Sequence, residues 1–276
     1  MKAGAVICGP DVAYGPLALF SGTFEQKVSK AAALGYDGIE LMVRDPAGLD
    51  WPQVAATLHH AGLAVPQIVT GELFGADGLC LVTPDDEVAS LALARTEAVI
   101  DLAAFLGASV NIGRLRGRLD WLARRPEIGD DQDKAWACAL DRLALVVSYA
   151  AGKGVRVTLE PINRYETDFI HTVADGLRVI EDIEADNLGL MLDLFHMNIE
   201  EASIEASLRR AGDHVWHIHI ADSGRRYPGS GHIAFAPIFV TLREMGYAGY
   251  VSAELLPQPD PDAAAKKTIE FLRQQI

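Results

Sequence analysis

The sequence predicts an α/β protein folded as a single (β/α)8 barrel that spans residues 1–276. Short apolar runs rich in β-formers alternate with longer stretches of helical period from end to end, which is typical of βα units. The chain has 276 residues and half of them are hydrophobic, which is enough for one large core. An open, doubly wound sheet is the competing architecture. No G-x-G-x-x-G motif follows the first strand, which argues against the dinucleotide-binding form of that sheet.

Eight strands and eight helices are expected in alternation. The strands are predicted at residues 5–8, 38–42, 65–69, 109–112, 155–159, 189–192, 216–220 and 251–253. The helices are predicted at residues 24–34, 51–61, 86–106, 133–153, 173–183, 204–211, 237–245 and 261–275. Eight strands, each followed by a helix in one domain of this length, favour the closed barrel.

Glycines mark the ends of five predicted helices. They are Gly35, Gly62, Gly107, Gly154 and Gly246, and each leads into a strand within a few residues. A residue with a left-handed backbone ends a helix at the least steric cost when it is glycine. The longest segments without a predicted element, 70–85 and 113–131, both follow strands. In a barrel they would be βα loops over the catalytic mouth.

The charge balance excludes some functions. There are 24 Lys and Arg against 38 Asp and Glu, a formal net charge of −14, which is the wrong sign for a protein that neutralises nucleic-acid phosphates. The N-terminus lacks the long apolar region of a signal peptide, and no run approaches 18 uninterrupted apolar residues, so no membrane partner is expected. Cys8, Cys80 and Cys138 are widely spaced without a C-x-x-C motif. A cytoplasmic protein with buried free thiols is expected.

Four polar residues stand at the ends of the last four predicted strands. They are Glu160, Asp193, His219 and Glu254, and in a barrel all four side chains converge on one mouth. A single acidic residue after a strand is more often a helix cap, but three carboxylates together would be costly to bury without a cation. An oxygen-rich set with one nitrogen suits Mn²⁺, Mg²⁺ or Co²⁺ better than a structural zinc site. A divalent metal site is therefore predicted.

Several segments resemble a known family. The runs LEPINRYETDFIHTVADGLRVIE, GLMLDLFHMNIEE, HIHIADSGRRYPGSGHIAF and GYVSAELLP are similar to the xylose-isomerase-like TIM-barrel family of sugar (phosphate) isomerases and epimerases, and within it to ketose 3-epimerases. GYDGIELMVRDP and DLFHMNIEE look closest to a branch that acts on keto-sugar acids, the 5-keto-L-gluconate epimerase type. The resemblance covers nearly the whole chain, and its motifs are most specific in the second half.

The resemblance assigns roles to individual residues. It implies that the same four strand-end residues hold the metal, with Mn²⁺ foremost, and that Glu160 and Glu254 are also the acid/base pair. Substrate contacts are implied for Glu166, His196 and Arg225. The resemblance also implies a small sugar or sugar-acid substrate and a homo-oligomer, either a dimer or a tetramer.

His217 lies two residues before His219 and would point to the same side of the strand. It would either support the metal ligand or be a hydrogen-bonded histidine in the barrel interior.

The predicted reaction follows from the chemistry of a ketone. A carboxylate can remove the weakly acidic proton beside a ketone only if the enediolate charge is stabilised as it forms, which is the Lewis-acid role of a metal. Inversion requires a base on one face and an acid on the other. Strands five and eight are not adjacent in an eight-strand ring, so Glu160 and Glu254 can flank the substrate. We therefore expect a divalent-metal-dependent epimerase of a keto-sugar or keto-sugar acid.

Three alternatives remain open. An aldose–ketose isomerase of the hydroxypyruvate or inosose isomerase type would use the same metal and glutamates. A nuclease similar to apurinic endonucleases would need further ligands for three metals and a basic groove, which the net charge of −14 opposes. A sugar-binding relative without activity would have lost one glutamate, and both are present.

The loop after the fourth strand carries alternating arginines. In GRLRGRLDW, Arg114, Arg116 and Arg118 lie at the expected barrel mouth of a strongly acidic protein. Arginine binds carboxylates through two parallel hydrogen bonds, so we expect Arg114 or Arg116 to recognise an anionic sugar acid. The alternative is that they pair with carboxylates of the protein.

Overall fold

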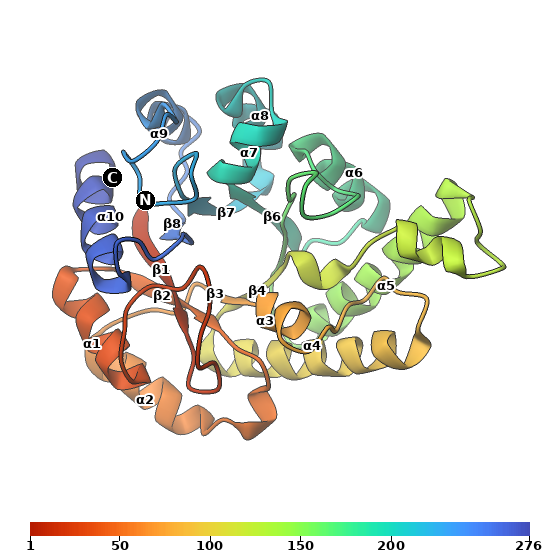
Figure 1. Cartoon of the computed structure of the whole chain (residues 1–276), viewed down its shortest axis with the longest axis horizontal. Helices are drawn as coiled ribbons and strands as arrows, with labels where there is room; N and C mark the ends of the chain where they lie inside the picture. Colours follow the sequence, from red (N-terminus) through yellow and green to blue (C-terminus); the bar gives the residue numbers. More distant parts are fainter.

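Eight parallel strands close into a barrel in the computed structural model, which describes residues 1–276 (Figure 1). The strands are β1 (Lys2–Cys8), β2 (Gly38–Met42), β3 (Gln67–Val69), β4 (Ser109–Ile112), β5 (Val157–Leu159), β6 (Leu188–Asp193), β7 (Val215–Ile220) and β8 (Tyr250–Ala253). Each strand pairs with the next, and β8 pairs with β1, so the sheet has no free edge. The predicted barrel is confirmed, and the open sheet is excluded.

The helices surround the barrel. They are α1 (Phe24–Leu34), α2 (Trp51–Ala61), α3 (Gly71–Gly75), α4 (Asp86–Leu106), α5 (Gln132–Gly152), α6 (Val173–Ile183), α7 (Leu194–Glu200), α8 (Ile204–Ala211), α9 (Phe235–Glu244) and α10 (Pro261–Gln275). Eight of them match the predicted helices to within a few residues. The sequence did not predict α3 and α7, because helices of 5 and 7 residues are too short to show a period. Both follow strands and lie on the side of the barrel that carries the candidate site.

The predicted glycines lie at helix ends. Gly35, Gly62 and Gly107 have left-handed backbones and cap α1, α2 and α4. Gly154 and Gly246 also have positive φ, but each lies one residue beyond the cap of its helix. These turns return the chain to the barrel within a few residues, which fixes where each strand begins.

The core has an apolar and a polar part. A cluster of 68 buried hydrophobic residues packs the strands against the helices. The inside of the barrel also carries buried polar side chains, which come from five strands: Glu40, Gln67, Thr158, His217 and Ser252. Hydrogen bonds connect them, as buried polar groups require.

One outer helix is unusually apolar. By length and composition, α5 could cross a membrane, but core helices of soluble proteins pass the same test, so this is weak evidence. Here α5 contacts its neighbours α4 and α6 as one of the outer helices, and its buried residues are Ala135, Ala139, Leu143, Val146, Val147 and Ala150.

The pairing of β6 with β7 contains a register shift. Leu190 pairs with Val215 but Met191 pairs with His217, so Trp216 is an additional residue on β7. The shift places Asp193 directly opposite His219 at the ends of the two strands. Two of the predicted metal ligands therefore become neighbours through this irregularity.

Gly189 gives Trp216 the space it occupies. A Cβ atom at position 189 would lie 2.2–2.6 Å from three atoms of the Trp216 indole. Gly189→Ala should therefore lower the free energy of unfolding in urea by about 1–3 kcal/mol, the usual cost of overpacking. Gly48→Ala is the matched control, because nothing lies within 4 Å of its added methyl group and its φ is not positive. Equal stability of the two variants would contradict this account.

Candidate active site

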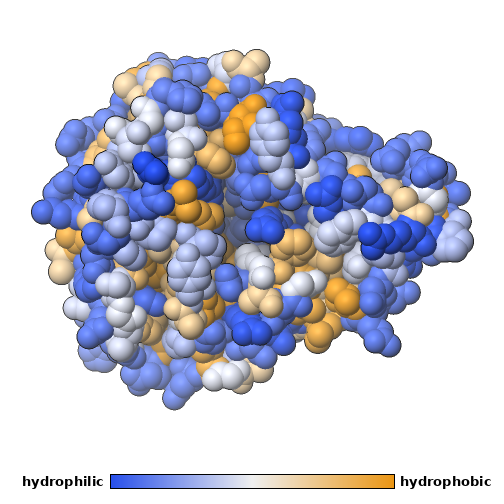
Figure 2. All heavy atoms as spheres, in the orientation of Figure 1, coloured by the Kyte–Doolittle hydropathy of each residue, from blue (hydrophilic) through white to orange (hydrophobic).

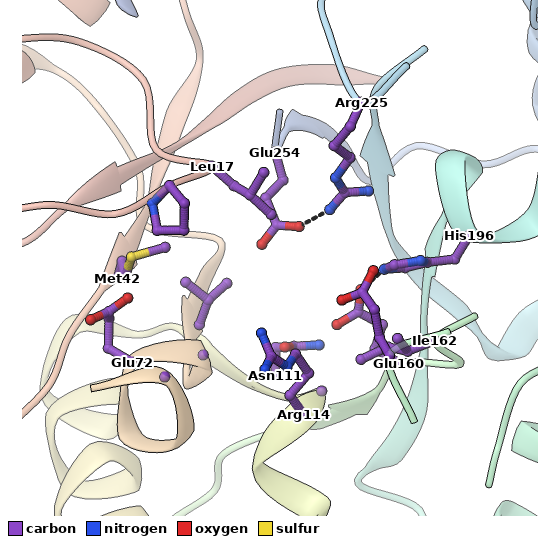
Figure 3. Close-up of a pocket in the computed structure, with 16 residues that line it drawn as sticks. Leu17, Met42, Glu72, Asn111, Arg114, Glu160, Ile162, His196, Arg225 and Glu254 are labelled. Atoms are coloured by element: carbon purple, nitrogen blue, oxygen red, sulfur yellow. Dashed lines mark hydrogen bonds and ion pairs between the residues drawn. The ribbon is translucent and has the colours of Figure 1, made fainter. Parts of the chain in front are cut away.

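A cavity of about 130 Å³ opens where the strands end. Figure 2 shows the molecule hollowed near the centre of this face, and Figure 3 shows the side chains that line the cavity. Lining residues from the first half of the chain include Pro16, Leu17, Met42, Glu72, Asn111 and Arg114, and those from the second half include Glu160, Ile162, Glu166, His196, Arg225 and Glu254. The predicted loop 70–85 does reach this mouth, because α3 forms one wall.

The four predicted metal ligands come together at the base of this cavity, where Glu160 and Glu254 line it and the other two lie beside them. One ligand atom from each of Glu160, Asp193, His219 and Glu254 lies within 4.8 Å of the other three. Glu160 follows β5, Asp193 ends β6, His219 is in β7 and Glu254 follows β8. Three of these side chains are buried and Glu254 is partly buried. The barrel thus gathers the cluster from four consecutive strands.

The hydrogen bonds of this cluster leave a free ligand atom on the imidazole. His219 donates from Nε2 to Glu40 Oε2 at 3.0 Å. Its Nδ1 atom is buried without a hydrogen-bond partner, 3.5 Å from Glu254 Oε2 and 3.9 Å from Asp193 Oδ2. A lone pair directed at carboxylates is unfavourable unless a cation lies between them. Three carboxylates and this nitrogen suit a divalent ion, so the residues fit the predicted metal.

Arg225 supplies positive charge beside the same carboxylates. It is buried, and it donates to Asp193 Oδ2 at 2.5 Å and to Glu254 Oε2. Its guanidinium also lies 4.7 Å from the centre of the Phe195 ring. Arg225 also lines the cavity.

The two glutamates have opposite pKa shifts. Burial, and then the charge of Glu254, raise the pKa of Glu160 well above its ordinary value. Burial would also raise the pKa of Glu254, but His219 and Arg225 hold that pKa below its ordinary value. A pair of titratable groups with divergent pKa values in one cavity is typical of an acid and a base.

Asn163 connects two predicted substrate contacts. Its amide nitrogen donates to Glu166 Oε1 at 3.0 Å and to His196 Nδ1 at 2.7 Å, while its Oδ1 accepts the backbone N–H of Tyr165. The proton of His196 is then on Nε2, which lies 3.6 Å from Glu160 Oε1. Burial lowers the pKa of His196, which favours a neutral ring. His196 can therefore donate a hydrogen bond to a substrate oxygen.

Sequence reasoning missed Asn163 and Glu40. Asn163 is within the LEPINRYE motif, and Glu40 is the only charged residue of the strand GIELM. A carboxylate among apolar neighbours in a fully buried strand was the available signal. The sequence did not show that Glu40 points into the barrel, where it contacts both His217 and His219.

Arg116 does not face the cavity, contrary to prediction. It has no exposed surface, and its guanidinium donates to the carbonyl oxygens of Gly113, Glu160, Phe169 and Ile170 at 2.8–3.1 Å. The 3-10 helix Arg114–Arg116 turns this side chain under the loop. Arg116 therefore fixes the backbone around Glu160 and is not available to a substrate.

Arg114 and Arg118 have different surroundings. Arg118 pairs with Asp120 at 2.9 Å, which is the alternative considered for the arginines of this loop. Arg114 lines the cavity and forms no ion pair with a protein carboxylate. Its guanidinium lies 4.7 Å from the centre of the Phe74 ring, which stacks on Trp121.

Substitution by methionine should affect the stability of the protein differently at Arg116 and at Arg114. Arg116→Met leaves buried carbonyl oxygens without donors, so it should lower the free energy of unfolding by at least about 3 kcal/mol. Arg114→Met is the matched control and should change that free energy by less than about 0.5 kcal/mol, because its side chain is exposed. Chemical denaturation of both variants gives the comparison. An unchanged midpoint for Arg116→Met would show that Arg116 has no structural role.

Comparisons with known proteins agree with the barrel. A family model described as xylose isomerase-like TIM barrel matches residues 28–275. An L-ribulose 3-epimerase from Mesorhizobium japonicum is 34% identical over 230 residues, which are 83% of this chain and 74% of that protein. A 3-dehydro-D-guloside 4-epimerase from Escherichia coli is 38% identical over 134 residues, 48% of this chain and 51% of that protein.

Solved structures give the same result. A 3-keto-D-glucoside 4-epimerase from E. coli has a TM-score of 0.81 at 26% identity, with 99% of both chains covered. An AP endonuclease of family 2 from Brucella melitensis has a TM-score of 0.77 over 96% of both chains at 18% identity, which shows the shared fold alone. The chain therefore belongs to the xylose isomerase-like TIM-barrel family, among relatives that include sugar epimerases.

Proposed function

We propose that this protein is a divalent-metal-dependent sugar epimerase that inverts a stereocentre beside the ketone of a keto-sugar or keto-sugar acid. The observation that carries the proposal is the placement of Glu160 and Glu254. They come from strands that are not neighbours, lie on different sides of the cavity in Figure 3, and each has a ligand atom within 4.8 Å of one on His219. The named relatives include L-ribulose and D-psicose 3-epimerases, which supports inversion next to a ketone.

The acid/base pair, the predicted metal ligands and His196 each have a part in this reaction. One glutamate removes the proton from the carbon beside the ketone, and the other delivers a proton to the opposite face. A divalent ion held by Glu160, Asp193, His219 and Glu254 would polarise the ketone oxygen and offset the charge that develops there. His196 would donate its Nε2–H to a substrate oxygen.

Mn²⁺ is the ion we propose, because the set has three carboxylates and one imidazole. A cytoplasmic location is consistent with the three cysteines, which are all unpaired. We also propose a homo-oligomer, as the family resemblance implies.

We further propose that a keto-sugar acid is the substrate. Arg114 is the only arginine of its loop that is both directed at the cavity and free of a protein carboxylate. The guanidinium lies 4.7 Å from the centre of the Phe74 ring, a cation–π contact that leaves its N–H groups available to a carboxylate. A 5-keto-L-gluconate-like acid has this group, and a neutral ketose does not.

Deuterium exchange tests the two-glutamate mechanism. In D₂O with saturating Mn²⁺, the wild-type protein should incorporate deuterium beside the ketone, form the epimer and give no aldehyde. Glu160→Gln and Glu254→Gln should each lower epimerisation at least about 100-fold, and each should keep exchange with only one of the two epimers, because one base remains. Asp193→Asn is the control: it removes a ligand but no base, so exchange should fall equally for both epimers.

Two results would change this assignment. An aldose product would establish the aldose–ketose isomerase instead. Exchange that persists with both epimers in each glutamate variant would exclude the paired-glutamate mechanism.

Arg114→Met tests the preference for acids. Loss of a charged contact to a bound carboxylate should raise KM for keto-hexonates about 10-fold or more and leave KM for neutral ketoses within about 2-fold. Steady-state assays on both substrate classes measure this. Arg118→Met is the matched control, because that side chain is already paired with Asp120. Equal changes of KM for acids and neutral sugars would remove the acid preference and leave the epimerase proposal intact.

A further inference from the structure

A second cluster of polar side chains lies inside the barrel behind the metal ligands. Glu40 has no exposed surface, and its two oxygens meet two imidazoles: Nε2 of His217 is 2.5 Å from Oε1, and Nε2 of His219 is 3.0 Å from Oε2. Ser252 Oγ is 3.1 Å from His217 Nε2, and the Gln67 amide donates to Glu40 Oε2 at 3.2 Å. Each oxygen of the Glu40 carboxylate therefore has at least one hydrogen-bond donor.

We propose that Glu40 is the positioning residue of the metal centre, which holds the ring of His219 with its proton on Nε2 and its lone pair on Nδ1. A carboxylate only accepts hydrogen bonds, and a neutral imidazole carries one N–H, so the contact with Glu40 decides which nitrogen is protonated. The nitrogen left free is the one that faces Asp193 and Glu254. This inference rests on the proposed function, because it needs a metal at the floor of the cavity.

His217 has a defined part in this arrangement. It lies two residues from His219 on the same strand, so both rings point into the barrel. His217 binds the oxygen of Glu40 that His219 does not use, which prevents the carboxylate from turning away. The two histidines of the WHIHI segment therefore act on one carboxylate, and only one of them faces the cavity's cluster of ligands.

The geometry favours a hydrogen-bonded clamp over a second metal site. Ligand atoms of Glu40, His217 and His219 are close enough to be considered for a metal. Donors bound to one ion at about 2.1 Å and at right angles are about 3 Å apart, so the 2.5 Å contact of His217 with Glu40 is too short for that geometry. A direct hydrogen bond accounts for this distance. One metal per chain is therefore expected.

Glu40→Gln is the decisive variant because it keeps the size of the side chain and removes its charge. Titration with Mn²⁺ should show binding weakened about 10-fold to 100-fold, the usual effect of losing the partner of a metal-ligating histidine. In ¹⁵N NMR of the metal-free protein, at a pH high enough for the His219 ring to be neutral, its proton should move from Nε2 to a mixture of the two nitrogens. Thr158→Val is the matched control: it removes a hydrogen bond to Gln67 in the same interior layer without touching Glu40. The control should change neither the Mn²⁺ affinity nor the tautomer.

The outcomes separate this inference from the proposed function. If Glu40→Gln does not fold, His217→Gln should show a smaller loss of Mn²⁺ affinity in the same direction, and unchanged affinity in that variant would overturn the inference. Wild-type Mn²⁺ affinity and an unchanged His219 tautomer in Glu40→Gln would overturn the positioning role while the epimerase remains. Two Mn²⁺ ions per wild-type chain and one in Glu40→Gln would show a second metal site instead. A wild-type chain that binds no divalent ion would overturn both.

Discussion

The repulsion among three carboxylates at one end of the barrel is the constraint on which the site depends. Glu160, Asp193 and Glu254 have ligand atoms within 4.8 Å of one another, and water is excluded from most of their surface. Such a group is stable only beside positive charge. The guanidinium of Arg225 supplies part of it, and the geometry accommodates a divalent ion for the rest.

The loop that carries Arg225 holds its guanidinium beside these carboxylates. Asp222 is fully buried, and its carboxylate accepts the backbone N–H groups of Ser223, Gly229 and Ile233. A short loop closed on one carboxylate can hold Arg225 at positive φ, a conformation that costs about 1–3 kcal/mol for a residue other than glycine. The contacts of the Arg225 guanidinium with Asp193 and Glu254 therefore offset the cost of this backbone conformation.

The sequence predicted those features that depend on strand ends and helix periods. Glu160, Asp193, His219 and Glu254 could be found because every parallel strand of a barrel delivers its last residue to one mouth, whatever the details of packing. The three arginines of residues 114–118 could not be separated in this way. They alternate in sequence, but a 3-10 turn directs one to the cavity and one under the loop, and only three-dimensional contacts distinguish them.

The two halves of the barrel contribute different parts of the site: the second half supplies the predicted ligands and the paired glutamates, and the first half supplies the opposite wall of the cavity. The ligands and the paired glutamates come from β5 to β8 and the residues directly after β5 and β8, where the strands fix the backbone closely. The opposite wall of the cavity comes from α3 and from the loops after β1 and β4, which supply Leu17, Glu72 and Arg114. Proton transfer beside a ketone needs a base, an acid and stabilisation of the enediolate charge, whereas substrates differ in the atoms that lie away from the ketone. Substitutions of Leu17, Glu72 or Arg114 can therefore change which sugar binds without disturbing the carboxylates that react with it.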